Sequence, residues 1–396
     1  MSLICKRIPV HKTIASIFKN TPQLLDECVF LNLAKHRHYV TKPKTEKIGK
    51  GVFRIGLTGL TVGALVGTGY SIHYMNKPRA HILNEEVTLP LLKELPDIKP
   101  TKSIRIVGDR SGLHLTLFQY QTCPFCCKVR AFLDYYGISY DIVEVDPVLR
   151  QSIKWSPYKK VPILVAKTEE GYQPLNDSTM IISALASYLK DSDKNIPEIA
   201  KCFPMIKYVE EDGSMKNEIM NRYFLMLSNQ RLQGMNETES NEERKWRKWA
   251  DSVLVHTLSP NVYRTKEEAL QAFNWFSEVG EWERNFPAWE RYLIIYVGAS
   301  VMWLIGKRLK KRHNLKDDVR QSLYDECSTW TRAINAKGGT FMGGDNPNLA
   351  DLAVYGVLSS IEGCTAFKDM LENTKISKWY YRMKETVLQH QGARFI

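Results

Sequence analysis

The sequence predicts an α/β domain followed by an all-helical domain. Three observations carry this prediction. The motif Cys123-Pro-Phe-Cys126 lies between an apolar run typical of a strand and an amphipathic helical pattern. Strand and helix patterns then alternate as far as residue 190, whereas helix-period patterns dominate residues 215–396. A length of 396 residues is also more than one domain usually needs.

The α/β domain is expected over residues 113–190. Its order of strand, helix, strand, helix, two strands and helix is that of the thioredoxin fold. Asp177 precedes the last helix as an N-cap. The expected elements are the strand Leu113–Tyr120, the helix Pro124–Tyr136, the strand Ser139–Val145, a short helix at 147–155, the strands Val161–Ala166 and Tyr172–Leu175, and the helix Ser178–Leu189.

The Cys123–Cys126 motif is the candidate reactive site. Pro124 suits the first position of a helix, so Cys123 should stand at the helix N-terminus, where N–H groups and the helix dipole stabilise a thiolate. The alternatives are a zinc ligand pair or two buried thiols. No second CxxC or histidine pair at ligand spacing accompanies the motif, so we expect a thiol site and no metal. Cys127 should be a packed small residue, and Tyr120 either donates a hydrogen bond to the thiolate or only closes the core.

Three further places could serve a ligand. Pro162, at the second position of a strand, is explained by a cis bond after Val161 that turns the chain toward the thiol, or by an edge strand. Asp177 and Ser178 are first of all a helix cap, and the same place could bind the γ-glutamyl end of glutathione. His256, at a mostly apolar helix end, is either a satisfied interior histidine or a pocket residue.

The helical domain is expected over residues 215–396. Its uncharged run Tyr292–Gly306 is short for a bilayer span, so we expect a buried core helix, with a re-entrant or second membrane segment as the alternative. Arg308 and Arg312 follow on one helix side, where they hold an anionic ligand jointly or form a solvated face. The expected helices are Met215–Leu232, Glu242–Thr257, Lys266–Glu278, Glu290–Asn314, Leu315–Ile334 and Leu349–Glu362, the last opened by a capping-box pattern at Asn348 and Asp351.

The N-terminal part of the chain is basic and then uncharged. Much of the net charge of +12 lies in the tail at residues 1–54, which favours targeting or membrane contact over nucleic acid. Residues 55–76 contain no Lys, Arg, Asp or Glu and predict a single membrane-anchor helix. A buried or flexible glycine-rich segment is the alternative.

Two linkers are expected, at residues 77–112 and 191–214, because both combine proline with charge. The apolar run Val87–Leu92 in the first linker could dock as a strand. The eight cysteines are scattered and form no disulfide framework, which favours a reducing compartment. Basic residues flank both ends of the predicted anchor, so its orientation stays open.

The chain contains several motifs in a fixed order. Each occurs across glutaredoxins and glutathione transferases, but their combination over residues 112–382 resembles the membrane-associated prostaglandin E synthase type 2 family. The motifs are Tyr120-Gln-Thr-Cys-Pro-Phe-Cys126, Lys160-Val-Pro-Ile-Leu-Val165, Leu175-Asn-Asp-Ser178, Leu258-Ser-Pro-Asn-Val-Tyr-Arg264, Lys307-Arg-Leu-Lys310, and Phe341-Met-Gly-Gly344 with Pro347-Asn-Leu-Ala-Asp-Leu-Ala-Val-Tyr355.

The resemblance implies a glutathione-transferase-like body, usually a homodimer, that isomerises prostaglandin H2 to prostaglandin E2 in a thiol-dependent reaction. Cys123 matches the catalytic thiol of the family, and Tyr120 and Phe125 match residues that shape its pocket. The positions that match its glutathione-binding residues are Val161, Asp177 and Ser178.

The family is also described as binding haem together with glutathione. In that state it degrades the endoperoxide to malondialdehyde and a hydroxy-heptadecatrienoic acid. Arg308 and Arg312 match basic positions of the haem site, and His256 and Ser259 match residues that line the pocket. Asn314 stands where the family has a further basic residue.

Three functions are therefore open: a thiol-dependent prostaglandin H2 isomerase, a glutathione- and haem-binding protein that degrades the same endoperoxide, and a general glutaredoxin-like reductase. A soft thiolate is a suitable partner for a weak O–O bond, and a lipid substrate would explain a membrane anchor. We expect a single-pass protein of the Golgi membrane with a processed cytoplasmic form, and a mitochondrial location as the alternative.

Overall fold

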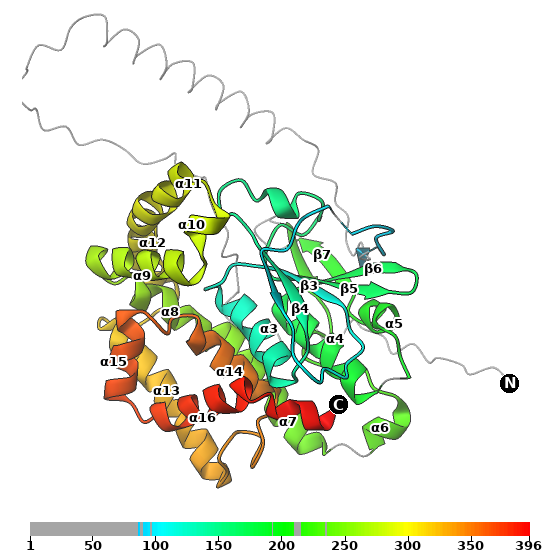
Figure 1. The fold of residues 1–396 in the computed structure, drawn as a ribbon. Helices are drawn as coiled ribbons and strands as arrows, with labels where there is room; N and C mark the ends of the chain where they lie inside the picture. Colours follow the sequence, from blue (N-terminus) through cyan, green and yellow to red (C-terminus); the bar gives the residue numbers. More distant parts are fainter. Residues whose placement is uncertain (1–85, 88–89, 96, 192, 210–214, 234–235) are drawn as a thin grey trace, which may run out of the picture. The chain divides into compact units, whose positions relative to one another are not determined.

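The computed structural model describes residues 86–87, 90–95, 97–191, 193–209, 215–233 and 236–396. The predicted basic tail, residues 1–54, and the predicted anchor helix, residues 55–76, lie outside the described residues. Within them, a thioredoxin-like sheet with its helices is followed by a helical domain, as the sequence predicts (Figure 1).

A five-stranded sheet forms the centre of the α/β part, in the order β2-β4-β3-β5-β6. β3 runs parallel to β4, and all other neighbours are antiparallel. The strands are β2 (Lys102–Ile104), β3 (Leu115–Gln119), β4 (Tyr140–Glu144), β5 (Ile163–Thr168) and β6 (Gly171–Asn176), and the helices are α3 (Pro124–Tyr135) and α4 (Ser178–Lys190), with a single 3-10 turn at Gln151–Ile153 where a longer helix was predicted.

Both faces of this sheet are buried. Successive side chains of a strand point to opposite sides, so neighbouring residues enter different apolar clusters. Leu117 and Leu164 join the main core together with Phe132 of α3. Phe118 and Ile163, their neighbours in sequence, belong to a second apolar cluster. The strands therefore read as apolar runs, and α3 begins after the end of β3, the central strand of the sheet.

The helical domain is built from helices of up to 26 residues. Two of them contain a π-helical stretch: α7 (Glu237–Trp249) continues through Ala250–Leu254 into α8 (Val255–Val262), and α11 (Ala288–Tyr292) continues through Leu293–Gly298 into α12 (Ala299–Arg312). The others are α6 (Asn229–Gln233), α9 (Lys266–Val279), α10 (Trp282–Asn285), α13 (Val319–Lys337), α14 (Leu349–Ser359), α15 (Thr365–Asn373) and α16 (Ser377–Leu388), followed by a 3-10 turn at Gln391–Phe395.

The helical domain packs on α3 through α14 and α16, which lie beside it in Figure 1. The predicted capping box of Asn348 and Asp351 opens α14 and is confirmed. Gly356 of α14 lies directly against the backbone of α3, since a Cβ at this position would lie 2.5 Å from the Cα of Lys128. The helix that begins at the CxxC motif is thus held between the sheet and the helical domain.

Replacing Gly356 with alanine should destabilise the protein, because the added methyl group meets the backbone of Lys128, 2.5 Å from its Cα and 2.7 Å from its nitrogen. We expect a loss of about 1 to 3 kcal/mol in the free energy of unfolding, measured in urea. Gly298→Ala is the matched control, since its methyl group would meet only the ring of Phe273, which can move. Equal losses in both variants would contradict this account.

The helix predicted from residue 215 was wrong, and the two predicted linkers contain regular elements. Residues 215–219 form strand β8 (Met215–Ile219), which pairs with β7 (Met205–Val209), whereas a helix was predicted from residue 215. Strand pairing overrides the helix propensity of this short charged segment. α5 (Ile196–Lys201) also lies in the predicted second linker, and β2 lies in the first. The predicted docking strand is confirmed in part, because β1 (Glu86–Val87) pairs with β7 and Leu92 bridges Tyr172.

The prediction of a buried core helix at residues 292–306 was also wrong. The helix exists, but only one side of it packs, mainly on α8 and α9. Ile294, Ile295 and Ala299 are buried, whereas Tyr296 and Leu304 on the opposite side are each 58% exposed. An uncharged run does not reveal how much of a helix surface its neighbours cover. This helix is the single described segment with the length and composition of a membrane span.

Candidate functional site

Cys123 stands where the turn after β3 meets α3. It is the N-cap residue of α3, with Pro124 at the first helical position as the sequence predicts. Its backbone N–H donates to the carbonyl of Tyr120 at 3.1 Å, and its carbonyl accepts from Cys127 at 2.9 Å. Cys123 is a half-buried reduced thiol. A thiolate at this place faces the positive end of the helix dipole.

Cys126 lies beside Cys123 but is fully buried. Burial, together with the hydrogen bond and the charge of Cys123, raises the pKa of the Cys126 thiol well above its ordinary value. Cys126 therefore keeps its proton at neutral pH, and Cys123 is the member of the pair that can act as a thiolate. Cys127 is buried as predicted, and its Sγ accepts a hydrogen bond from Arg130 at 3.1 Å.

The backbone of Gln121, two residues before Cys123, is hydrogen-bonded through both its N–H and its carbonyl. Its N–H donates to Oε1 of Glu144 at 2.6 Å, and its carbonyl accepts from Arg130 at 2.6 Å. Gln119 closes the ring, because its side chain donates to Glu144 at 3.1 Å and accepts from Arg130 at 2.5 Å. This network fixes the turn that carries the thiol.

Glu144 should make stability depend on pH. Burial raises the pKa of its carboxyl from 4.5 to about 7. The stabilising effect of the protonated form is complete below pH 4.5 and is lost as the pH rises to about 7. Glu144→Gln cannot ionise, so its stability relative to the wild type should rise across this window by on the order of 1 to 3 kcal/mol.

Urea unfolding from pH 4 to pH 8 measures this difference. Glu169→Gln, measured in the same way, is the control for replacing a glutamate, because Glu169 is exposed in the same domain. A flat difference for Glu144→Gln would mean that the Glu144 carboxyl titrates normally.

A buried ion pair joins α3 to the helical domain. The ammonium group of Lys128 contacts a carboxylate oxygen of Asp251, in the π-helical stretch after α7. It also donates to the hydroxyl oxygens of Ser178 at 3.2 Å and Thr179 at 3.0 Å. Asp251 accepts from Thr179 at 2.6 Å and from the hydroxyl of Tyr223 at 3.1 Å. Ser178, predicted from the sequence, is thereby tied to two charged residues that were not predicted.

Asp177 caps α4 as predicted. One of its carboxylate oxygens accepts from the backbone N–H groups of Thr179 at 2.8 Å and Met180 at 3.2 Å, and the other lies 3.5 Å from Arg222. Asp177 has a φ of +70°, which its neighbours hold in place. The start of α4 thus brings a carboxylate and a guanidinium together in one small region.

The predicted cis peptide bond between Val161 and Pro162 is confirmed. It immediately precedes β5, the strand next to β3, and β3 leads into the CxxC turn. Val161 and Tyr120 are partly buried against the same apolar cluster, which places both beside this turn. Phe125 is partly buried, and the ammonium group of Lys128 lies 5.8 Å from the centre of its ring. The sheet order brings these predicted residues to one end of the α/β part.

Of the residues predicted for the helical domain, Arg312 lies near His256. The His256 ring stacks on that of His313 with 4.1 Å between centroids, and among the described residues neither of its buried ring nitrogens has a hydrogen-bond partner. Burial and the neighbouring His313 and Arg312 lower the pKa of His256 to about 4. The carbonyl of Ser259 is close to Gly306 of α12, and Arg308 is exposed on α12. Among the described residues nothing satisfies the His256 ring, and its role as a pocket residue stays a prediction.

Asp251 connects the residues at the start of α4 with His256. It hydrogen-bonds Thr179 at the start of α4, and its charge acts on His256. Sequence reasoning missed Asp251 and its partner Lys128. The sequence offered one sign of them, a charged residue within an otherwise apolar helix face. Charged residues of this kind are also common on solvated surfaces.

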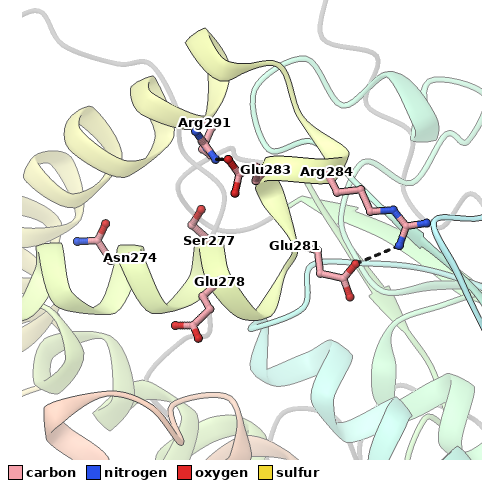
Figure 2. A pocket seen from close by; sticks show the side chains of 7 residues that line it. All are labelled: Asn274, Ser277, Glu278, Glu281, Glu283, Arg284 and Arg291. Carbon is pink, nitrogen blue, oxygen red and sulfur yellow. Dashed lines mark hydrogen bonds and ion pairs between the residues drawn. The ribbon is translucent and has the colours of Figure 1, made fainter.

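A cavity of about 520 Å3 lies at another place in the helical domain (Figure 2). Its lining residues are all polar or charged, and they form two ion pairs, between Glu283 and Arg291 and between Glu281 and Arg284. None of the residues predicted for the thiol site lines this cavity, and a charged wall does not suit a lipid. Its lining residues are Asn274, Ser277, Glu278, Glu281, Glu283, Arg284 and Arg291.

Residues 117–188 match the family of glutathione S-transferase N-terminal domains. The glutathione transferase F7 from Populus trichocarpa aligns with a TM-score of 0.39 and 14% identity, over 70% of this chain and 99% of that chain. The prostaglandin E synthase 2 of Danio rerio is 50% identical over 284 residues, which cover 71% of this chain and 72% of that protein. The prostaglandin E synthase 2 of Mus musculus is 47% identical over 293 residues, covering 74% and 75%. With this identity over more than two thirds of both proteins, the chain belongs to the prostaglandin E synthase 2 family.

Proposed function

We propose that this protein is a prostaglandin E synthase that isomerises prostaglandin H2 to prostaglandin E2, with Cys123 as its reactive thiol. The observation that carries the proposal is the arrangement of the two cysteines. Cys123 is half-buried at the start of α3, whereas Cys126 is fully buried with a raised pKa. This asymmetry suits a single reactive thiolate, and two relatives that share about half of the aligned residues carry the name of the activity.

The reaction needs no net oxidant or reductant. The Cys123 thiolate attacks one endoperoxide oxygen, so that an S–O bond forms and the O–O bond breaks. The other oxygen leaves as an alkoxide and takes a proton to become the hydroxyl. Loss of the proton on the carbon that bears the S–O oxygen then forms the C=O bond and expels the thiolate. The product is an isomer of the substrate with one ketone and one hydroxyl group.

We place the glutathione site at the start of α4. A γ-glutamyl α-carboxylate would meet the Ser178 hydroxyl and the guanidinium of Arg222, and its α-amine would meet the Asp177 carboxylate. Val161, before the cis peptide bond, would pair with the peptide backbone of glutathione, as in other thioredoxin-like proteins. These groups are preorganised, since Ser178 and Asp177 are each held by the hydrogen bonds described above.

The test is product identification. The full-length protein is incubated with prostaglandin H2, with and without glutathione, and the products are resolved by mass spectrometry. Prostaglandin E2 above the spontaneous background is the expected result. Only malondialdehyde and the hydroxy-heptadecatrienoic acid, under every thiol condition, would contradict the proposal.

A second candidate function rests on His256. Among the described residues its buried ring nitrogens have no hydrogen-bond partner, and the cationic Arg312 lies near them. An imidazole N–H and a guanidinium both donate, so they fit an anionic acceptor such as a haem propionate. Arg308, Arg312, His256 and Ser259 would then hold haem, which would supply the degradative chemistry when bound with glutathione. A Soret band that appears on addition of haem with glutathione, and is lost in Arg308→Ala/Arg312→Ala, would support this function. No haem uptake under any thiol condition would exclude it.

We further propose that the protein is a homodimer attached to the Golgi membrane by residues 55–76. Removal of residues 1–76 should release it from membranes after alkaline washing. Retention of the shortened chain in the membrane fraction would contradict a single anchor.

A further inference from the structure

One face of the helix Ala288–Arg312 is apolar and aromatic, and its side chains are exposed in the part of the chain that the structure describes. Its exposed side chains recur at intervals of three and four residues, which places them along a single stripe. The stripe ends in a cationic turn. Its apolar members, exposed by 43–58%, are Trp289, Tyr292, Leu293, Tyr296, Val297 and Leu304, and its exposed cationic members are Lys307, Arg308, Lys311 and Arg312.

We propose that this stripe docks on the surface of an anionic lipid bilayer. Tryptophan and tyrosine prefer the boundary between head groups and acyl chains, where the ring is apolar and its polar atom stays wet. Lysine and arginine beside such a surface are attracted by the negative charge of anionic lipids. The acidic residue in this helix, Glu290, is buried and faces away from the stripe. At about 1.5 Å per residue, the helix could lie along the membrane for roughly 37 Å.

The predicted membrane anchor supports a bilayer as the partner of this face. Thirteen residues, 77–89, separate the uncharged segment at residues 55–76 from Pro90. An extended chain of that length spans at most about 45 Å. If the segment crosses a bilayer, the described part of the protein is held close to its surface, and docking then costs little further entropy.

A second copy of the chain fits this stripe less well. In a parallel pairing, the cationic ends of two stripes would face one another. In an antiparallel pairing, they would face residues 281–291 of the partner, where Glu281 and Glu283 already pair with Arg284 and Arg291. Neither arrangement neutralises the cationic turn, whereas anionic head groups do.

Photocrosslinking tests the proposal in the full-length protein. Tyr296 is replaced with the photoreactive residue p-benzoylphenylalanine, and the protein is reconstituted in phosphatidylcholine vesicles with or without phosphatidylserine. Tyr381 on α16 is the matched control, since it is a tyrosine that is 53% exposed but does not belong to the stripe. Illumination should yield a lipid adduct at position 296 and none at position 381, as read by mass spectrometry.

A second variant tests the role of charge. Lys307→Gln/Lys311→Gln in the probe-bearing protein should lower the adduct yield several-fold on vesicles with phosphatidylserine and leave it unchanged on phosphatidylcholine alone. A covalent protein dimer through position 296 would overturn the proposal in favour of a second copy. Equal lipid adducts at positions 296 and 381, or none at position 296, would also overturn it.

Discussion

Replacing Cys123 with serine should lower the rate of prostaglandin E2 formation by a factor on the order of 1,000 or more. Serine keeps the size and position of the side chain at the N-cap of α3, so the fold should survive. What it removes is the thiolate, since a hydroxyl does not ionise near neutral pH even at a helix N-terminus. The rate of prostaglandin H2 conversion and the product distribution measure the effect, and an unchanged thermal unfolding midpoint confirms the fold.

Cys126→Ser is the matched control for this prediction. Because Cys126 is buried and keeps its proton, its replacement should change the isomerisation rate by less than about threefold. The pair of variants also separates isomerisation from a dithiol reductase. A reductase that works through a Cys123–Cys126 disulfide would lose activity in both variants. Wild-type activity in Cys123→Ser would show that the bound thiol, and not Cys123, attacks the endoperoxide.

The thioredoxin-like part was predictable because its signals are local. Apolar alternation, the CxxC spacing with Pro124, and the cap at Asp177 each lie within a few residues of the element that they specify. The cis bond at Pro162 was predictable for the same reason, since proline at that place in a strand leaves few alternatives.

The errors have a common physical origin. β2 and β8 have only three and five residues with mixed polarity, and pairing with a distant strand stabilises them. Whether the helix through Tyr296 is buried depends on how many helices surround it, which its own composition does not encode. Lys128 and Asp251 are 123 positions apart, so no motif could join them. The residues that hold the site together are therefore the ones that a sequence reveals least.

Removing the charge of Lys128 should have the largest effect on stability. Although burial acts to raise the pKa of Asp251, the charge and hydrogen bond of Lys128 hold it below its usual value. In Lys128→Met, Asp251 keeps its charge without its partner, in a site that is almost closed to water. We expect a loss of about 3 to 5 kcal/mol in the free energy of unfolding. Lys248→Met is the control, because Lys248 is exposed, and it should change stability by less than about 0.5 kcal/mol.

A double-mutant cycle separates the cost of an unpaired charge from the worth of the pair. Lys128→Met/Asp251→Leu should recover much of the loss, since two apolar residues need no partner. It should not recover glutathione binding, because Ser178 loses the ammonium group that orients its hydroxyl. A raised KM for glutathione in a stable double variant would therefore identify Lys128 as a positioning residue. If stability and KM return together, the ion pair serves only to join the two domains.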